Sequence, residues 1–127
     1  MSKIPEELLY DAEQHLWIKI DDDTALIGIT DFAQDQMGEL LFVDLPEEDD
    51  EYERGDVFSC VESNKKDNDL EAPFALTILE SNGDLEDEPE AVNEDAYDNW
   101  IVKVQIINDD GISELVDSQA YAGAIGE

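Results

Sequence analysis

The stretch VESNKKDNDLEAP, residues 61–73, sets two adjacent lysines, Lys65 and Lys66, in a polar segment between two apolar runs. Strand-like residues on both sides of a short polar segment predict a β-hairpin with the lysines near its turn. Two interpretations stay open. The segment is either a solvated loop in which Asp67 and Asp69 neutralise the lysines, or a hairpin that presents a lysine amine for acylation by another protein. The spacing of the flanking acids does not choose between the two lysines, because its midpoint falls between them.

Short apolar and β-branched runs separated by turn residues continue on both sides of this hairpin, and this pattern predicts β-strands. The expected strands span residues 15–20, 24–30, 40–45, 57–63, 70–72, 74–79 and 100–107. Many short strands with few helices predict a mainly β fold, either a flattened barrel or a sandwich. We expect one domain over residues 1–127.

Helices and loops account for the other segments. Asp31 is expected to cap a short helix over residues 32–38, directly after the first hairpin. Residues 112–125 have apolar residues at helical spacing and predict a C-terminal helix. Residues 1–14 are expected to be a polar lead-in with at most one helical turn, and residues 81–99 a long polar loop.

Charge excludes several classes of function. The 127 residues carry 36 aspartates and glutamates against 6 lysines and arginines, for a formal net charge of -30. Nucleic-acid binding needs a basic face and is therefore excluded, and docking on an anionic membrane is disfavoured. A single cysteine, Cys60, cannot form an internal disulfide, and no apolar run reaches the ~20 residues of a membrane span. We therefore expect an acidic cytoplasmic protein without a signal peptide.

The residues that usually carry catalysis are scarce. The chain has one histidine, His15, and one arginine, Arg54, and it contains neither a nucleophile elbow nor a phosphate-binding loop. The acidic runs at residues 21–23, 47–50 and 86–88 do not follow the calcium-loop pattern and are interpreted as solvated loops. The sequence therefore predicts no catalytic residue and no metal site, and the protein is not expected to be an enzyme.

The remaining conspicuous side chains are expected to be structural. Trp17, Phe42 and Trp100 are predicted to be core residues, because large aromatic side chains are mostly buried. Cys60 is interpreted as a buried strand residue rather than a nucleophile. His15 is interpreted as a hydrogen-bonded strand residue rather than a base.

Five motifs, in order along the chain, resemble those of one known family. They read HLW at residues 15–17, GITDFAQ at 28–34, GELLFVDLP at 38–46, ESNKKDNDLEAP at 62–73 and EPEAVNED at 88–95, the last followed by Tyr97 and Trp100. In this order and spacing they are similar to motifs of the H protein of the glycine cleavage system. The similarity runs in register from about Tyr10 to Tyr121. Each motif is weak alone, whereas five in register indicate kinship.

The resemblance has consequences for the fold and for the cofactor. It implies a lipoyl- or biotinyl-domain-like flattened barrel with the modified lysine on the tip of a hairpin. It also implies lipoic acid bound covalently to Lys65. The hairpin residues that flank this attachment site are Glu62, Ser63, Asn64, Lys66 and Asp69.

The resemblance further implies the function of a lipoyl carrier protein in the glycine cleavage system. Such a carrier shuttles an aminomethyl group between a pyridoxal-phosphate-dependent glycine decarboxylase, a tetrahydrofolate-dependent aminomethyltransferase and a dihydrolipoamide dehydrogenase. A lipoyl ligase or lipoyl transferase attaches the prosthetic group. The carrier performs no chemistry of its own, and tethering raises the effective concentration of the carried group at each enzyme.

Several positions depart from the family pattern, among them Leu16, Asn64, Lys66 and Leu76. The family has an acid at the position of Leu16, where the loaded arm packs, so the resemblance implies that this chain lacks an anionic partner for the arm. Lys66 adds a positive charge beside it. These departures leave an alternative open: a divergent H-like lipoyl carrier, or a lipoyl-relay protein, that serves a different enzyme system.

The charge balance generates a testable prediction about stability. Self-repulsion among carboxylates opposes the compact state, and at molar salt the screening length falls to ~3 Å. We expect the melting temperature to rise as monovalent salt is added, which calorimetry measures directly. A melting temperature that stays flat from low salt to about 2 M would contradict this expectation.

Overall fold

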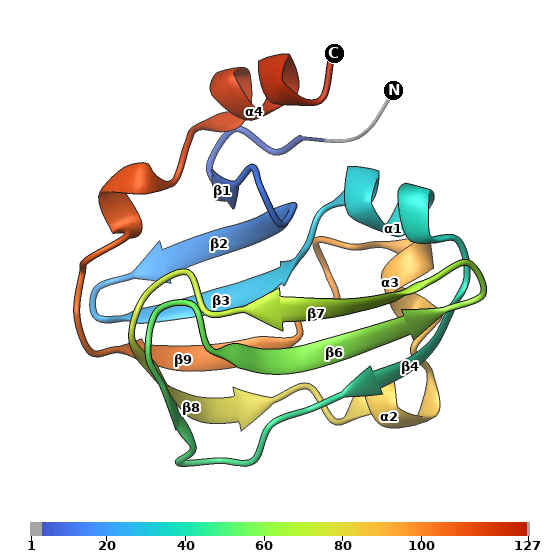
Figure 1. Ribbon diagram of the computed structural model, residues 1–127, viewed down its shortest axis with the longest axis horizontal. Coiled ribbons are helices and arrows are strands. Elements are labelled where there is room, and N and C mark those ends of the chain that lie inside the picture. Colours follow the sequence, from blue (N-terminus) through green and yellow to red (C-terminus); the bar gives the residue numbers. More distant parts are fainter. Residues whose placement is uncertain (1–3, 127) are drawn as a thin grey trace.

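Two antiparallel β-sheets packed face to face form the body of the computed structural model, which describes residues 4–126 (Figure 1). The larger sheet has the order β1-β2-β3-β9-β8-β5 and consists of β1 (Leu9–Asp11), β2 (Leu16–Asp21), β3 (Thr24–Ile29), β9 (Val102–Ile106), β8 (Leu76–Ser81) and β5 (Glu51–Tyr52). The smaller sheet has the order β4-β6-β7 and consists of β4 (Leu40–Asp44), β6 (Val57–Ser63) and β7 (Asp67–Glu71). The two sheets do not close into a barrel, so the predicted mainly β fold is confirmed in its sandwich form.

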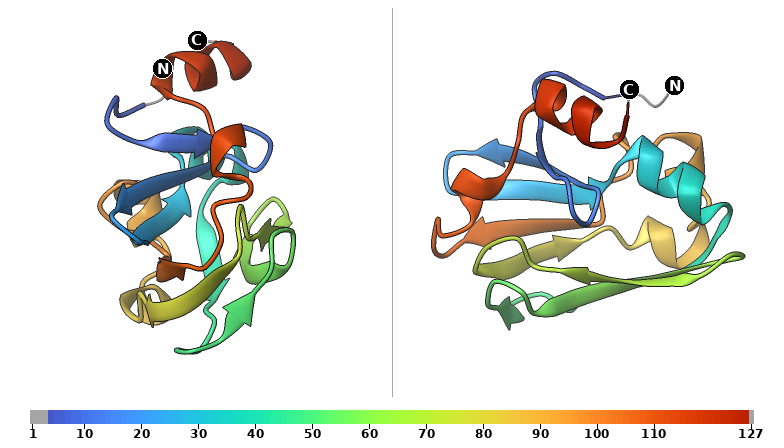
Figure 2. Two further views of the ribbon diagram at one scale, coloured as in Figure 1. Left: turned by 90° about the vertical axis from the view of Figure 1, so that its left-hand side faces the viewer. Right: turned by 45° about the horizontal axis from the view of Figure 1, so that its top comes forward.

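Short helices connect the strands. They are α1 (Asp31–Met37), α2 (Asp84–Asp87), α3 (Ala91–Glu94), the 3₁₀ turn η1 (Ile112–Glu114) and α4 (Ser118–Ala124). Three of them, α1, α2 and α3, lie at the same end of the sheets (Figure 1). Both views of Figure 2 show α4 next to β1 and away from the smaller sheet. Ring stacking holds it there, because the rings of Tyr10 and Tyr121 lie 4.7 Å apart and almost parallel. Across residues 4–126, every helix is too short or too polar to serve as a membrane span.

Local sequence pattern predicted most strands well. β2, β3, β4, β6 and β9 lie where they were expected, within two residues at either end. β7 begins at Asp67, three residues earlier than predicted, because its polar residues pair with β6 through the backbone. β8 begins at Leu76 rather than at residue 74, after Pro73. Strand pairing in both places depends on backbone groups that apolar patterning does not report.

The predictions for the two ends of the chain were right only in part. The predicted C-terminal helix is confirmed as α4 but is shorter than expected, because the chain is extended between η1 and α4. The expected polar lead-in contains β1, which pairs with β2. The Tyr10 amide donates to the Val116 carbonyl at 2.8 Å, and the Val116 amide donates to the Tyr10 carbonyl at 2.9 Å. Residue 116 is therefore extended, and the helix cannot run through it. Local periodicity contains no sign of this contact.

The remaining local predictions need smaller corrections. The short helix after the first hairpin is confirmed as α1, but Thr30 rather than Asp31 is its N-cap, since the Thr30 hydroxyl accepts the Ala33 amide at 3.1 Å. The predicted polar loop over residues 81–99 contains two single-turn helices, α2 and α3. Both present one apolar residue, Leu85 and Val92, to the core.

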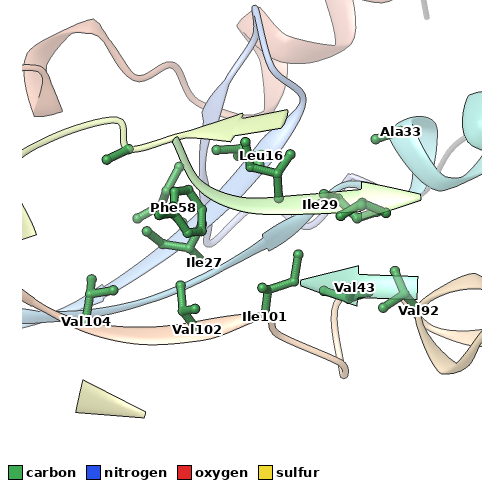
Figure 3. Close-up of a cluster of buried hydrophobic side chains, with 14 of the residues drawn as sticks. Leu16, Ile27, Ile29, Ala33, Val43, Phe58, Val92, Ile101, Val102 and Val104 are labelled. Carbon is green, nitrogen blue, oxygen red and sulfur yellow. The ribbon is translucent and has the colours of Figure 1, made fainter. Parts of the chain in front are cut away.

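The inner faces of the two sheets form the main hydrophobic core. Ile27, Val102 and Val104 from the larger sheet meet Phe58 and Val43 from the smaller one (Figure 3). All five side chains are buried. Burial of apolar surface of this kind is the main favourable contribution to folding.

Two of the three aromatic residues predicted to be core lie elsewhere. Trp17 is buried as expected, and its indole N–H donates to the Ala96 carbonyl at 3.0 Å. Trp100 is only partly buried, and Phe42 is 45% exposed. A β-bulge between Leu40 and Phe42 explains the exposure, because the extra residue turns Phe42 to the outer face of the sheet.

Core packing generates a matched pair of predictions. We expect Ile27→Ala to lower the free energy of unfolding by about 2 to 5 kcal/mol, because Ile27 has no exposed surface and its loss leaves a cavity. Ile107→Ala is the control, since Ile107 is 57% exposed, and its effect should stay within about 0.5 kcal/mol. Urea denaturation measures both. Equal effects would show that the main core does not lie between the two sheets.

Candidate lysine-presenting site

The predicted lysine hairpin is the β6–β7 connection, and its turn is tight. Glu62 pairs with Asp67 across the two strands. The Ser63 amide donates to the Lys66 carbonyl at 3.0 Å, so Ser63 and Lys66 face each other at the end of the ladder. Asn64 and Lys65 are therefore the two apex residues. Spacing alone could not separate the lysines, whereas the turn geometry puts one at the apex and the other at the strand end.

Ser63 organises the turn. Its hydroxyl donates to the Lys66 carbonyl at 2.7 Å and accepts the amides of Lys65 and Lys66 at 3.4 and 3.2 Å. One hydroxyl can donate once and accept twice, so this side chain uses its full capacity inside the turn. The backbone around Lys65 is thereby ordered, while its own side chain takes no part in holding the turn.

The side chain of Lys65 passes over the backbone of Gly38 as it leaves the turn. A Cβ built at Gly38 would lie 2.6 Å from Oδ1 of Asn64 and 3.3 Å from Cε of Lys65, so the apex packs on the bare backbone of Gly38. Gly38 also has a φ of 79°, a conformation that residues with a Cβ rarely adopt. The Asn64 amide donates to the Glu39 carbonyl at 3.1 Å and ties the apex to the same segment.

The interpretation of the hairpin as a self-neutralised loop is not supported. Lys65 and Lys66 are exposed, and within residues 4–126 neither has an ion pair closer than 4.0 Å. The one ion pair found in that part of the chain joins Arg54 to Glu114, far along the sequence from both lysines. The Lys65 amine is thus not held by a counter-ion.

The acids predicted to flank the site lie on the outer face of the smaller sheet. Glu62, Asp67 and Asp69 are all exposed, on β6 and β7. Cys60, directly opposite Asp69, is half-buried rather than fully buried. Burial raises the pKa of its thiol, and the hydrogen bond with Asp69 and the charges of Asp67 and Glu62 raise that pKa further. Cys60 is therefore kept protonated and is a poor nucleophile, as expected.

A groove of about 350 Å³ runs beside the hairpin, between β7 and α1. Its lining includes His15, Met37, Lys66, Asn68 and Leu70. The Asn68 side-chain amide nitrogen is buried there, and no acceptor for it exists among the described residues. The groove lies next to the lysine turn and is lined mainly by polar residues, with Met37 and Leu70 in its apolar part.

His15 borders this groove as a structural residue. It precedes β2 with a φ of 61°, so the prediction of a strand residue was wrong, whereas its hydrogen bonding is confirmed. Its Nδ1 lies 2.9 Å from the hydroxyl of Tyr121. Burial lowers the pKa of His15, Asp11 opposes this shift, and the charge of Lys66 adds to it. The imidazole of His15 is therefore favoured in its neutral form, and its contact with Tyr121 helps to hold the C-terminal helix.

Leu16 does not lie where the resemblance implied. Its side chain has no exposed surface and belongs to the main core between the sheets (Figure 3). The strand alternation explains this placement, because Leu16 and Ile18 point toward the core from β2. Leu16 is therefore buried away from solvent and does not line the groove beside the hairpin. Over the described part of the chain, no group of metal-ligating side chains occurs.

The fold and the site define a class of protein: a small β-sandwich carrier that presents one lysine at a hairpin apex. Comparison with known proteins identifies one family. The model of the glycine cleavage H-protein family matches residues 8–127, so the chain belongs to that family. Members of this family carry lipoic acid bound covalently to a lysine.

Individual relatives cover nearly the whole chain. The glycine cleavage system H proteins of Staphylococcus saprophyticus and Staphylococcus epidermidis are each 46% identical to it over 125 residues, which is 98% of both chains compared. The crystal structure of a glycine cleavage system H protein from Mycobacterium marinum superposes with a TM-score of 0.89 at 34% identity. That match covers 98% of this chain and 100% of the other.

The contact between Gly38 and the apex generates a prediction with a matched control. Gly38→Ala and Gly55→Ala both put a Cβ at positive φ, 79° and 91°, and each should cost about 1 to 3 kcal/mol of stability. A Cβ at Gly55 meets nothing within 4 Å, whereas one at Gly38 collides with Asn64. We expect only Gly38→Ala to slow modification of the hairpin lysine by a lipoyl ligase, by about 10-fold, because the lysine is displaced.

Kinetics of lipoylation, measured together with thermal melting, separate the two effects. Equal lipoylation of both variants would mean that Gly38 supports folding and has no influence on the position of the lysine.

Proposed function

We propose that Lys65 carries the lipoyl group and that the chain acts as the lipoyl carrier of a glycine cleavage system. The observation that supports this best is the turn geometry: Lys65 is an apex residue of the β6–β7 hairpin in a member of the H-protein family. Ser63 Oγ, which holds the turn together, bonds only backbone atoms of the lysines. Acylation of the Lys65 amine would therefore leave the turn intact.

The competing lysine is less suited to attachment. Lys66 sits at the strand end, where its carbonyl accepts both the amide and the hydroxyl of Ser63. Its side chain lines the groove beside the hairpin, whereas Lys65 does not. A group on Lys65 starts from the outermost point of the hairpin and can either reach a partner or fold back along the groove.

Bound lipoic acid would supply a disulfide–dithiol couple that accepts a group at one enzyme and gives it up at another. The chain itself positions and tethers the lipoyl arm. The ordered turn sets the origin of the arm, the flexible lysine stem extends its reach, and tethering replaces free diffusion between enzymes.

The family implies interaction with the other components of the glycine cleavage system. We propose a pyridoxal-phosphate-dependent glycine decarboxylase, a tetrahydrofolate-dependent aminomethyltransferase and a dihydrolipoamide dehydrogenase as those partners. A lipoyl ligase or lipoyl transferase would load Lys65. We further propose that the chain works in the cytoplasm as a single carrier domain and not as an enzyme, in keeping with the family match over residues 8–127.

The alternative of a carrier for a different enzyme system has lost one of its arguments. It depended on several departures from the family pattern, among them Leu16 and Lys66 as groups that disfavour a cationic loaded arm. Leu16 is buried in the core and does not face the arm. Lys66 alone does not favour a different partner enzyme.

The attachment site can be tested with three proteins. We expect a lipoyl ligase to load the unmodified chain and Lys66→Arg, and to leave Lys65→Arg without the mass of a lipoyl group. Arginine keeps the charge and much of the length of lysine but cannot be acylated in this way. Intact mass followed by peptide mapping measures the result. Label on Lys66, or no label under conditions that load a control H protein, would refute the assignment.

The partner assignment needs one further assay on the same samples. The lipoylated chain should support exchange of labelled bicarbonate into glycine by glycine decarboxylase, and the Lys65→Arg protein should not. Loading without any exchange would leave Lys65 as the attachment site and point to a different enzyme system.

A further inference from the structure

A side-chain amide on α3 reaches the segment on which the lysine turn rests. Nδ2 of Asn93 donates to the Gly38 carbonyl and to Oε1 of Gln34, both at 2.8 Å. Its Oδ1 accepts the Leu40 amide at 2.9 Å. Three hydrogen bonds use both amide hydrogens and the oxygen. The backbone groups also determine the orientation of this amide, because a carbonyl must face the nitrogen and an amide must face the oxygen.

Asn93 bonds the residues on both sides of Glu39, whose carbonyl anchors the hairpin. Gly38 and Leu40 are bonded to Asn93, and the residue between them, Glu39, presents the carbonyl that accepts the Asn64 amide. In Figure 1 the turn between β6 and β7 lies next to this connection between α1 and β4. Asn93 thus holds the residues on both sides of the anchor carbonyl without touching the hairpin.

The connection between the end of α1 and the start of β4 is short. It has two residues, Gly38 and Glu39, and Gly38 is the residue type with the greatest backbone freedom. The Gly38 amide is bonded to the Gln34 carbonyl at the end of α1. Leu40 is held by its pairing with Ser63 of β6 and by burial of its side chain. Asn93 supplies the bond to the Gly38 carbonyl, so loss of its donors should loosen the backbone directly before the Glu39 carbonyl.

We propose that Asn93 is a positioning residue for Lys65, acting through the 38–40 segment and the bond from Asn64 to Glu39. This inference rests on the proposed role of Lys65 as the lipoyl attachment residue. An anchored apex keeps the turn in the conformation that a lipoyl ligase must recognise. A loosened apex would populate that conformation for a smaller fraction of the time and raise the apparent KM in proportion.

The test compares Asn93→Asp with Asn82→Asp. Each change adds the same charge and removes one side-chain amide, and both residues are partly buried. The amide of Asn82 bonds the Trp100 carbonyl at 2.8 Å, in a different loop. We expect Asn93→Asp to speed hydrogen exchange of the Asn64 amide by about 10-fold relative to Asn82→Asp. In lipoylation it should raise KM by about 5-fold and change kcat by less than about twofold.

Several outcomes would overturn the proposal. Asn64 exchange and KM that are the same in the two variants would show that Asn93 has a structural role only. A fall in kcat with unchanged KM would show that it acts after recognition. The exchange measurement uses unmodified protein, so it stays valid even if Lys65 proves not to be the lipoylated residue.

A measurement on the unaltered chain covers the case in which Asn93→Asp does not fold. The amides of Leu40 and Asn64 should exchange through one shared opening, with the same dependence on denaturant, because both depend on the 38–40 segment. Opening of Asn64 that is independent of Leu40 would overturn the proposal.

Discussion

Burial of the inner face of β6 is the interaction on which the site depends. Phe58 and Val61 carry this strand into the core between the sheets, where it packs against residues of β3 and β9. The same strand continues to Ser63 and turns at Lys65. The apolar half of β6 therefore anchors the polar half, and the lysine extends from a strand that the core holds firmly. A loop of equal length without such a strand would spread the lysine over many positions.

On the outer face of that strand, charge repulsion destabilises the sheet. Glu62 and Asp67 face each other across β6 and β7, and like charges directly opposite each other destabilise a sheet. Apolar burial on the inner face opposes this repulsion, and salt reduces it. The hairpin is thus stable because burial of its apolar inner face outweighs the repulsion between carboxylates on its outer face, which stays in water.

Sequence pattern predicted those features of the fold that depend on neighbours along the chain. Alternation located β6, and the order of motifs identified the family. Features set by distant contacts could not be predicted. The pairing of Tyr10 with Val116 keeps the chain extended before α4 and shortens the C-terminal helix, and the bulge beside Leu40 exposes Phe42.

The site shows the same division. The lysine pair was visible in the sequence, but spacing did not separate Lys65 from Lys66, because the turn is determined by the hydroxyl of Ser63. The place of Leu16 in the core and the bonds of Asn93 to the 38–40 segment depend on how β2 and α3 pack. The EPEAVNED motif contains Asn93, yet nothing in a single sequence indicates which of its residues reaches across to another helix.

The acidic face around Cys60 has a chemical consequence for a protein that transports a disulfide–dithiol couple. A thiolate attacks disulfides, whereas a protonated thiol does so poorly. Half-burial and the neighbouring carboxylates raise the pKa of Cys60 and keep its proton in place. The raised pKa lowers the thiolate fraction of Cys60 and so slows any attack of this thiol on a lipoyl disulfide. The same carboxylates that repel one another across the hairpin contribute to this protection.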